Sequence, residues 1–262
     1  MPKAQRQFRT QAIILSRRDF GESDRLLTLY TPLRGKLRAI AKGARKPSAK
    51  ISGHVELFAR SDCLIHRGRN LDILTQAELV DAYLGLREDL GRGAYANYVA
   101  ELLDRFTADE DDDSGDVFLL LHQTLSRIAE SADPRLAARY FELRLLDLTG
   151  FRPELQECVL TRRRLLPEPQ FFSNEEGGVV SRAAAPQVTS RLAEIDFDTL
   201  KLLRHLQRSV ESYAAVSSLR VTARQHQRAE RIMLSYMSHL LERKLESVDF
   251  IHRLRRQFSQ RA

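Results

Sequence analysis

The sequence predicts an α+β protein in which a small β domain is followed by a larger helical domain. Two observations support this division. Between residues 9 and 80, short apolar stretches alternate with turn residues, which is typical of β structure. From Tyr83 onward, apolar residues recur at helical spacing. With 262 residues, of which 43% are hydrophobic, the chain is long enough for more than one packed domain.

Five candidate strands follow one another in the first part of the chain. A turn at residues 19–22 separates the first two, and a turn containing Pro32 and Gly35 ends the second. The candidate strands span residues 11–16, 25–30, 36–40, 54–66 and 73–80. Because short strands rich in turns are typical of small barrels, we expect a five-stranded, closed or partly open barrel of the oligonucleotide-binding type.

Helices are predicted over about residues 95–106, 117–128 and 133–150. The third begins at Asp133 and Pro134, where an aspartate suits the N-cap and a proline the first turn. We expect these helices to form a bundle, and helices near residues 197–206 and 232–241 to complete the helical core. The basic residues from Arg253 onward are expected to fray.

Prolines and glycines interrupt residues 151–190, which we interpret as an insertion or small knuckle. The expected organisation is therefore a barrel at residues 1–80, a first helical part at 81–150, the insertion at 151–190 and a second helical part at 191–262.

Positive charge is concentrated in the predicted barrel. The whole chain has a formal charge of +7. Residues 1–80 contain sixteen Lys and Arg against seven Asp and Glu, a net charge of +9, and the remaining residues contain 26 against 28, a net charge of −2. This asymmetry favours nucleic acid or an anionic surface as the partner of the barrel. A dispersed surface charge that serves solubility is the alternative.

The basic stretch at residues 34–50 predicts a phosphate-binding surface. Alternate side chains of a strand point to opposite faces, so Lys36 and Arg38 are expected to face outward. A basic strand next to a basic loop forms a groove for a polyanion, whereas the alternative is a solvated edge that prevents aggregation between strands. The candidate DNA-binding residues are Arg34, Lys36, Arg38, Lys42, Arg45, Lys46 and Lys50.

Four further residues of the barrel are weaker candidates. Arg67 and Arg69 lie in a predicted turn, where exposed arginines are common. Tyr30 and Phe58 are candidates for stacking on bases, although aromatic residues of strands more often belong to the core.

Several stretches of the chain, in this order, resemble the RecO family of bacterial recombination mediators, and the resemblance covers nearly the whole chain. Its N-terminal part lies in residues 21–31, 35–37 and 41–46. The middle part comprises residues 141–146 with Gly150, Pro153, Leu155 and Cys158, and the last part comprises Tyr236, His239, Leu240 and Leu245.

The resemblance implies an oligonucleotide-binding barrel followed by a helical domain, and our own hypothesis is a non-enzymatic protein. The resemblance also implies a role in DNA repair and recombination, binding of single- and double-stranded DNA, and annealing of complementary strands. The implied partners are RecR and the acidic C-terminal tail of the single-stranded DNA-binding protein. RecA is implied indirectly, because it replaces that protein on gapped DNA.

An acidic tail that ends in an apolar residue requires a groove with cations at its mouth and aliphatic walls. Arg139 and Arg144, in the predicted helix before Gly150, are the candidates for these cations. Ordinary solvent-facing arginines are the alternative.

The chain departs from the resemblance where many family members carry a four-cysteine zinc knuckle. Only Cys158 is present, and the other three positions fall on Thr161 and near Ser181 and Ala184. Because a structural zinc site needs four good donors, we predict that the chain binds no zinc, and that apolar side chains hold this region together. These are Leu165, Leu166, Phe171, Phe172 and Val179. A metal analysis that finds one equivalent of zinc per chain would contradict this prediction.

Other chemistry is disfavoured by the sequence. The acidic run at residues 109–113 is interpreted as a linker rather than a nuclease site for two metal ions, because contiguous carboxylates diverge and no other motif completes such a site. Scattered histidines, including His239, lack metal-ligand spacing, and no nucleophile, phosphate-loop or dinucleotide motif is found. We therefore expect no catalytic residues, no metal and no cofactor. The remaining alternative is an interaction adaptor whose barrel binds an acidic protein.

Two cysteines, Cys63 and Cys158, lie far apart in the chain, so the sequence predicts no disulfide framework and fits a reducing compartment. Neither a secretory signal nor an apolar run of membrane-spanning length is found. We expect a cytoplasmic, nucleoid-associated protein without a membrane partner.

Overall fold

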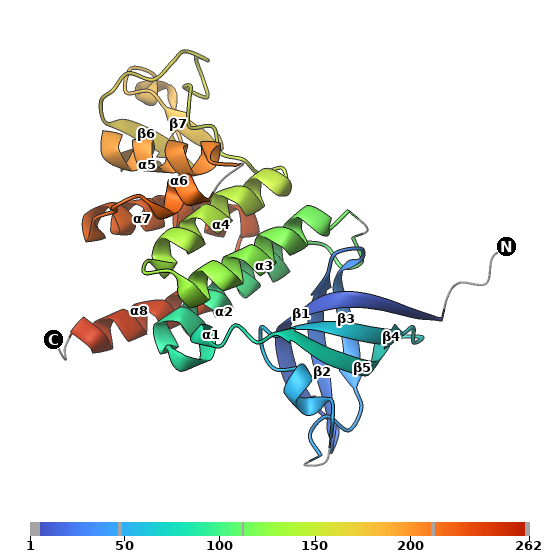
Figure 1. The fold of residues 1–262 in the computed structure, drawn as a ribbon. Helices are drawn as coiled ribbons and strands as arrows, with labels where there is room; N and C mark the ends of the chain where they lie inside the picture. Colours follow the sequence, from blue (N-terminus) through green and yellow to red (C-terminus); the bar gives the residue numbers. More distant parts are fainter. Residues whose placement is uncertain (1–5, 47–48, 112, 211–212, 260–262) are drawn as a thin grey trace. The chain divides into compact units, whose positions relative to one another are not determined.

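The computed structural model describes residues 6–46, 49–111, 113–210 and 213–259 (Figure 1). The chain divides into two compact units, Met1–Glu130 and Ser131–Ala262. Among the described residues, the first unit contains the β-barrel and three α-helices, and the second contains five α-helices and a three-stranded sheet. The fold is α+β, with a five-stranded N-terminal sheet followed by helices, as predicted.

Five strands close into a barrel in the order β1-β2-β3-β5-β4. Strand β1 is long enough to pair with β2 through its second half and with β4 through its first half, and its register shifts between Ile14 and Ser16. Antiparallel pairing joins most neighbours, whereas β3 and β5 pair in parallel over residues 39–41 and 72–74. The strands are β1 (Gln7–Phe20), β2 (Asp24–Thr31), β3 (Gly35–Ala41), β4 (Arg60–His66) and β5 (Asp72–Asp81).

Side-chain alternation places one face of each strand inside the barrel. The inward face of β3 supplies Leu37, Ala39 and Ala41 to the barrel core, together with Leu27 and Leu29 of β2. The predicted strand at residues 54–66 is correct only for its second half. A short 3₁₀ helix, η1 (Ser52–His54), precedes β4, and Phe58 adopts a left-handed conformation with φ of 65°, which a regular strand does not accommodate.

Three helices complete the first unit: α1 (Gly85–Glu88), α2 (Leu90–Phe106) and α3 (Gly115–Glu130). The carboxylate of Asp89 accepts a hydrogen bond from the backbone of Arg92 and caps α2. Ser114, which precedes α3, is buried and bonds to the barrel. The helix at 95–106 and the helix at 117–128 are thus observed, each a few residues longer than predicted.

The second unit is built around α4, which packs on α5 and α7. Asp133 caps α4 and Pro134 occupies its first turn, as the sequence predicts. Asp196 caps α5, and Thr222 and Gln225 form a capping box at α7. The helices are α4 (Pro134–Leu148), α5 (Phe197–Arg208), α6 (Ala214–Ser217), α7 (Ala223–Leu241) and α8 (Glu246–Ser259).

The end of the chain differs from the prediction that it frays. Residues up to Ser259 form α8, in which Ile251 and Leu254 are buried. Arg255 of α8 makes two charge-assisted hydrogen bonds, of 2.9 and 2.7 Å, to the carboxylate of Glu230 in α7. Apolar spacing together with this ion pair therefore outweighs the basic composition of the segment.

The region at residues 151–195 contains a small sheet of order β7-β6-β8. Its strands are β6 (Gln170–Ser173), β7 (Gly178–Val180) and β8 (Leu192–Ile195), and a 3₁₀ helix, η2 (Ala185–Gln187), lies between the last two. Cys158, Val180 and Ala184 form its buried cluster, with Leu165 and Phe171 packed against it. Leu166, which the sequence assigned to this core, is instead 64% exposed.

Candidate nucleic-acid interface

A turn and a loop of the barrel are hydrogen-bonded to each other at the end of β3. The turn joins β1 to β2 at residues 21–23, and the loop follows β3 at residues 42–46. The carboxylate of Asp24 accepts a hydrogen bond of 2.7 Å from the backbone N–H of Gly43, and the carbonyl of Ser23 accepts one of 2.9 Å from Arg45. Gly43 has φ of 65°, a conformation that favours glycine. Two stretches that carried the family resemblance are therefore neighbours in space.

Arg45 fastens this loop. Its guanidinium donates to the carbonyls of Gly21 and Glu22, at 3.3 and 3.2 Å, and lies 3.1 Å from the carboxylate of Asp19. These contacts satisfy much of the hydrogen-bonding capacity of the side chain. Arg45 thus holds the loop in place, and less of its charge is available to a ligand than the sequence suggested.

Lys42, Lys46 and Lys50 are exposed. Within the described ranges, no ion pair or hydrogen bond engages their ammonium groups. Arg34, before β3, is half-buried, and its guanidinium lies 4.6 Å from the centre of the Phe8 ring, within the range of a cation–π contact. Four of the seven predicted DNA-binding cations therefore have no carboxylate partner in the described part of the chain.

Lys36 has a different environment from the one predicted. The side chain leaves the barrel as the alternation requires, but Lys36 is only 7% exposed. Its ammonium group donates to the carbonyls of Asp104 and Thr107, at 2.7 and 3.0 Å, and lies 3.2 Å from carboxylate oxygens of both Asp104 and Asp109. Lys36 therefore joins the barrel to the end of α2 and has no donor to spare for a phosphate.

Arg38 and the turn arginines remain at the surface. Arg38 is exposed, and its guanidinium lies 3.8 Å from the carboxylate of Asp109. Arg67 lies 3.7 Å from the carboxylate of Glu110, and Arg69 is exposed. At these distances and exposures, the two ion pairs are weak.

The two aromatic candidates for base stacking belong to the interior. Tyr30 is 0% exposed and Phe58 is 5% exposed. Burial and the nearby Asp111 carboxylate raise the pKa of Tyr30. Neither ring offers a face to a base, so the common tendency of strand aromatics to fill the core holds here.

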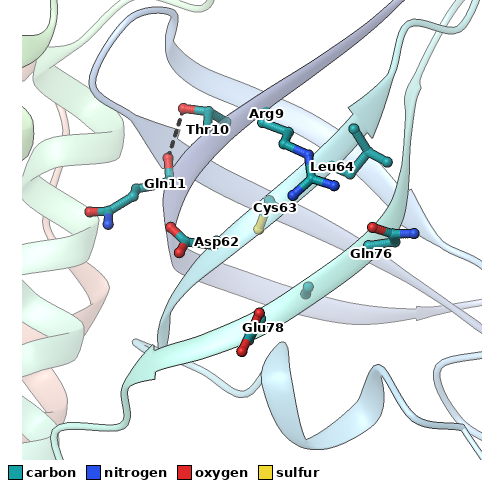
Figure 2. Close-up of a pocket in the computed structure, with 9 residues that line it drawn as sticks. Arg9, Thr10, Gln11, Asp62, Cys63, Leu64, Gln76 and Glu78 are labelled. Carbon is teal, nitrogen blue, oxygen red and sulfur yellow. Dashed lines mark hydrogen bonds between the residues drawn. The ribbon is translucent and has the colours of Figure 1, made fainter.

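A cavity of 460 Å³ lies on the barrel surface between β1, β4 and β5 (Figure 2). Arg9 supplies its only lining cation among the described residues, and Asp62 and Glu78 supply carboxylates. Gln11 and Gln76 complete its polar wall. Because the carboxylates outnumber the guanidinium, this cavity is poorly suited to phosphate, and the exposed lysines beyond β3 are the better candidates.

The two arginines predicted for the partner's tail do not line a groove mouth. Arg139 is 3% exposed and forms an ion pair of 2.5 Å with the buried Glu142. Arg144 forms an ion pair of 2.5 Å with Asp147, and its side chain is 14% exposed. Both charges are therefore used inside the second unit, where one turn of α4 separates each arginine from its carboxylate.

A groove with the required character lies elsewhere in the second unit, beside α5. It has a volume of 270 Å³ and is lined by Leu202, Leu219 and Val221. Lys201, His205, Arg208 and Arg220 surround these apolar side chains, together with Asp198 and Gln225. The sequence signal that could have found it is the seven-residue spacing of Lys201 and Arg208, which places both cations on one face of a helix.

Hydrogen bonds connect Cys158 with Thr161, Ser181 and Ala184, the three positions where the sequence predicted that zinc ligands are lost. The Cys158 sulfur accepts a hydrogen bond of 3.3 Å from the backbone of Ser181, whose hydroxyl accepts one of 3.3 Å from Ala184. Burial alone would raise the pKa of Cys158, but hydrogen bonds from Ser181 and Thr161 lower it to about 6. Ser181 and Thr161 thus donate hydrogen bonds to the Cys158 sulfur, and Ala184 donates to the Ser181 hydroxyl.

The described residues also bear on metal sites and on membrane spans. Among them, no group of three or more His, Cys, Asp and Glu side chains is arranged to hold a metal ion. In the same part of the chain, no helix has the length and apolar character needed to cross a membrane.

Comparison with known proteins assigns both parts of the chain. The family model described as "Recombination protein O N terminal" matches residues 5–83, and "Recombination protein O C terminal" matches residues 87–249. The chain is 38% identical over 251 residues to "DNA repair protein RecO" of Roseiflexus sp. (strain RS-1), which covers 95% of this chain and 87% of that protein. It is 36% identical over 246 residues to the protein of the same name in Pelotomaculum thermopropionicum, which covers 94% of each. A RecO protein of Dehalococcoides mccartyi is 36% identical over 200 residues, or 76% of this chain and 78% of that protein. The chain therefore belongs to the RecO family.

Proposed function

We propose that this protein is a DNA-binding mediator of DNA repair and recombination that anneals complementary strands. Curated relatives over nearly the full length are named DNA repair proteins. The closed five-stranded barrel has the strand number expected for the oligonucleotide-binding type, to which we assign it.

The observation that carries the proposal is the exposed group of Lys42, Lys46 and Lys50 next to a fastened turn. Their ammonium groups have no carboxylate partner among the described residues, so a phosphate does not have to displace one. The loop base is held by Asp24 and Arg45, which limits the entropy lost when a ligand binds. Arg34, which has no carboxylate partner among the described residues, extends this cationic surface to the beginning of β3.

Annealing follows from charge screening and needs no chemical step. Two nucleic-acid strands repel each other, and a cationic surface that neutralises both allows complementary bases to meet. Once the bases are paired, their faces are stacked inside the duplex and cannot contact the protein. Counterions then replace the protein's cations at the phosphates, and the protein is released. We therefore propose a non-enzymatic protein that requires neither a cofactor nor structural zinc.

We further propose that the groove beside α5 binds the acidic C-terminal tail of the single-stranded DNA-binding protein. Lys201, Arg208 and Arg220 would face the tail's carboxylates, and Leu202 and Val221 would contact its terminal apolar side chain. RecR is the proposed second partner, and RecA acts afterwards on the exposed strand.

The experiment that tests DNA binding removes two unpaired lysines. We expect the K42Q/K46Q variant to bind a short single-stranded oligonucleotide more weakly at low salt. Each lost phosphate contact lowers the slope of log K against log salt by about 0.7, so the slope should fall by up to about 1.4. Fluorescence anisotropy titrations at several salt concentrations measure both quantities.

The R87Q/R105Q variant is the matched control, because it removes two exposed cations from helices of the same unit. An unchanged affinity and slope for K42Q/K46Q, or equal losses in both variants, would contradict the assignment of the site. If the wild-type protein binds no oligonucleotide but binds an acidic polypeptide, the adaptor alternative is correct.

A further inference from the structure

Acidic residues that follow α2 lie along the basic strand β3. The backbone N–H of Glu110 donates to the carbonyl of Lys36 at 3.0 Å, and Asp109 forms a parallel bridge with Lys36. The described pairing of β3 with β5 begins at Ala39, so the first half of β3 presents an edge to this stretch. We call residues 109–111 the acidic segment.

Two carboxylates of the acidic segment contact three cations of the barrel. Asp109 lies 3.2 Å from the ammonium of Lys36 and 3.8 Å from the guanidinium of Arg38. Glu110 lies 3.7 Å from the guanidinium of Arg67. The segment thus neutralises part of the surface that the sequence predicted to bind phosphate.

Close backbone contacts with the barrel hold the acidic segment in place. Gly35 has φ of 53°, and a Cβ atom at that position would lie 3.1 Å from the carbonyl oxygen of Asp111. The backbone of Gly35 also donates to the hydroxyl of Ser114 at 2.7 Å, and that buried hydroxyl donates to the carbonyl of Thr31 at 2.9 Å. Contacts on both sides of the acidic segment therefore fix its path across β3.

We propose that the acidic segment is an internal competitor of DNA, which occupies cations of β3 and of the neighbouring turn with its own carboxylates. This inference rests on the proposed function and adds its regulation. The side chains of Arg38, Asp109 and Glu110 are 57%, 54% and 62% exposed, so their ion pairs are weak enough for a phosphate to exchange with them. Lys36, in contrast, stays engaged through two carbonyl groups.

Competition of this kind limits binding to ligands that supply many phosphates at once. A nucleic-acid strand that contacts the exposed lysines can also contact the guanidinium groups of Arg38 and Arg67, but only if its phosphates displace the carboxylates of Asp109 and Glu110. Neutralising these two side chains should therefore extend the phosphate-binding surface along β3 while leaving the backbone contacts of the segment in place.

The test compares D109N/E110Q with the wild-type chain and with the control variant D113N/E88Q. The control removes one Asp and one Glu charge that are exposed in the same unit and that contact none of the three cations among the described residues. It thereby accounts for the general gain in affinity from a more positive net charge. Anisotropy titrations with a single-stranded oligonucleotide at about 0.05 M and about 0.3 M salt provide the readout.

We expect D109N/E110Q to bind about three- to tenfold more tightly than the control at low salt, with a slope steeper by about 0.7 to 1.4 and a smaller difference at high salt. The added substitutions R38Q/R67Q should abolish this gain, while they cost little in the wild-type background. If D109N/E110Q does not fold, E110Q alone carries the test, because Arg67 is the one ion-pair partner of the Glu110 carboxylate among the described residues.

Equal affinities of D109N/E110Q and D113N/E88Q, or a gain that survives R38Q/R67Q, would overturn the inference while leaving the proposed function intact. If neither the wild-type protein nor K42Q/K46Q responds to any oligonucleotide, the proposed function fails and the inference falls with it.

Discussion

Lys36 illustrates what a sequence pattern can predict about a single residue. Strand alternation correctly places Leu37 inside the barrel and Lys36 on the opposite side. It carries no information on what covers that side, because Asp104 and Asp109 lie about 70 residues further along the chain. Exposure of Lys42 and Lys46, in contrast, depends mainly on a local loop that Gly43 allows, and the sequence indicated it.

The substitution K36M separates a structural role from a role in binding. Loss of the ammonium leaves two backbone carbonyls and the Asp104 and Asp109 carboxylates without their donor. We expect this to reduce the free energy of unfolding by about 1–3 kcal/mol. The control K42Q removes an exposed lysine and should change stability by less than about 0.5 kcal/mol. Urea denaturation measures both. A K36M variant as stable as the wild type that binds DNA less well would restore the interpretation drawn from the sequence.

At the scale of elements, the sequence predicted four of the five barrel strands and the helices α2, α3, α4 and α5 within about five residues, but it placed the start of α7 nine residues too late and did not predict α1, α6, α8 or the strands β6, β7 and β8. The exceptions have physical causes. The stretch at residues 54–59 alternates like a strand, but Phe58 adopts a positive φ there and β4 begins at Arg60. The stretch from Arg253 onward was predicted to fray because it is rich in arginine, yet residues up to Ser259 belong to α8, in which a carboxylate on another helix, that of Glu230, balances Arg255. A local window of sequence contains no information about a partner that lies on another element.

The pairing of α7 with α8 should depend on pH through Glu230. Burial alone would raise the pKa of this carboxyl, but hydrogen bonds and charge from Arg255, with Arg139 and His252 nearby, lower it to about 2. Because the folded pKa lies below the ordinary value of 4.5, the stabilisation is complete above about pH 4.5 and is lost as the pH falls toward 2. We expect hydrogen exchange of the α8 amides to accelerate over that range.

In the variant E230Q, the α8 amides should exchange faster already at pH 7, because the free energy of opening α8 is lower by about 2–3 kcal/mol. The exchange rate should change little further between pH 7 and pH 3. E194Q, which neutralises an exposed glutamate of the same unit, is the control and should behave like the wild-type chain. Slow exchange in E230Q at neutral pH would show that apolar contacts of Ile251 and Leu254 suffice to hold the helix.

For the molecule as a whole, the charge count of residues 1–80 overstated how many cations of the barrel are available to a ligand. Of the seven predicted DNA-binding cations, Lys36, Arg38 and Arg45 have carboxylate partners in the structure. Counting residues cannot detect such pairing, because Asp109 lies outside the barrel sequence. The same limit applies to Arg139, whose buried partner, Glu142, removes it from the surface.

The proposed annealing mechanism makes a prediction about salt that concerns the whole molecule. Without protein, annealing accelerates as salt rises, because the repulsion between two strands is screened. Annealing promoted by a cationic surface should show the opposite trend, because counterions compete for the phosphates. We therefore expect the ratio of the rates with and without protein to be largest at low salt and to approach one at about 0.5 M.

Stopped-flow measurements with complementary labelled strands give both rates. K42Q/K46Q should reach a ratio of one at a lower salt concentration than the wild-type chain, and R87Q/R105Q should not. An acceleration that is independent of salt would mean that contacts with bases, rather than phosphate neutralisation, bring the strands together.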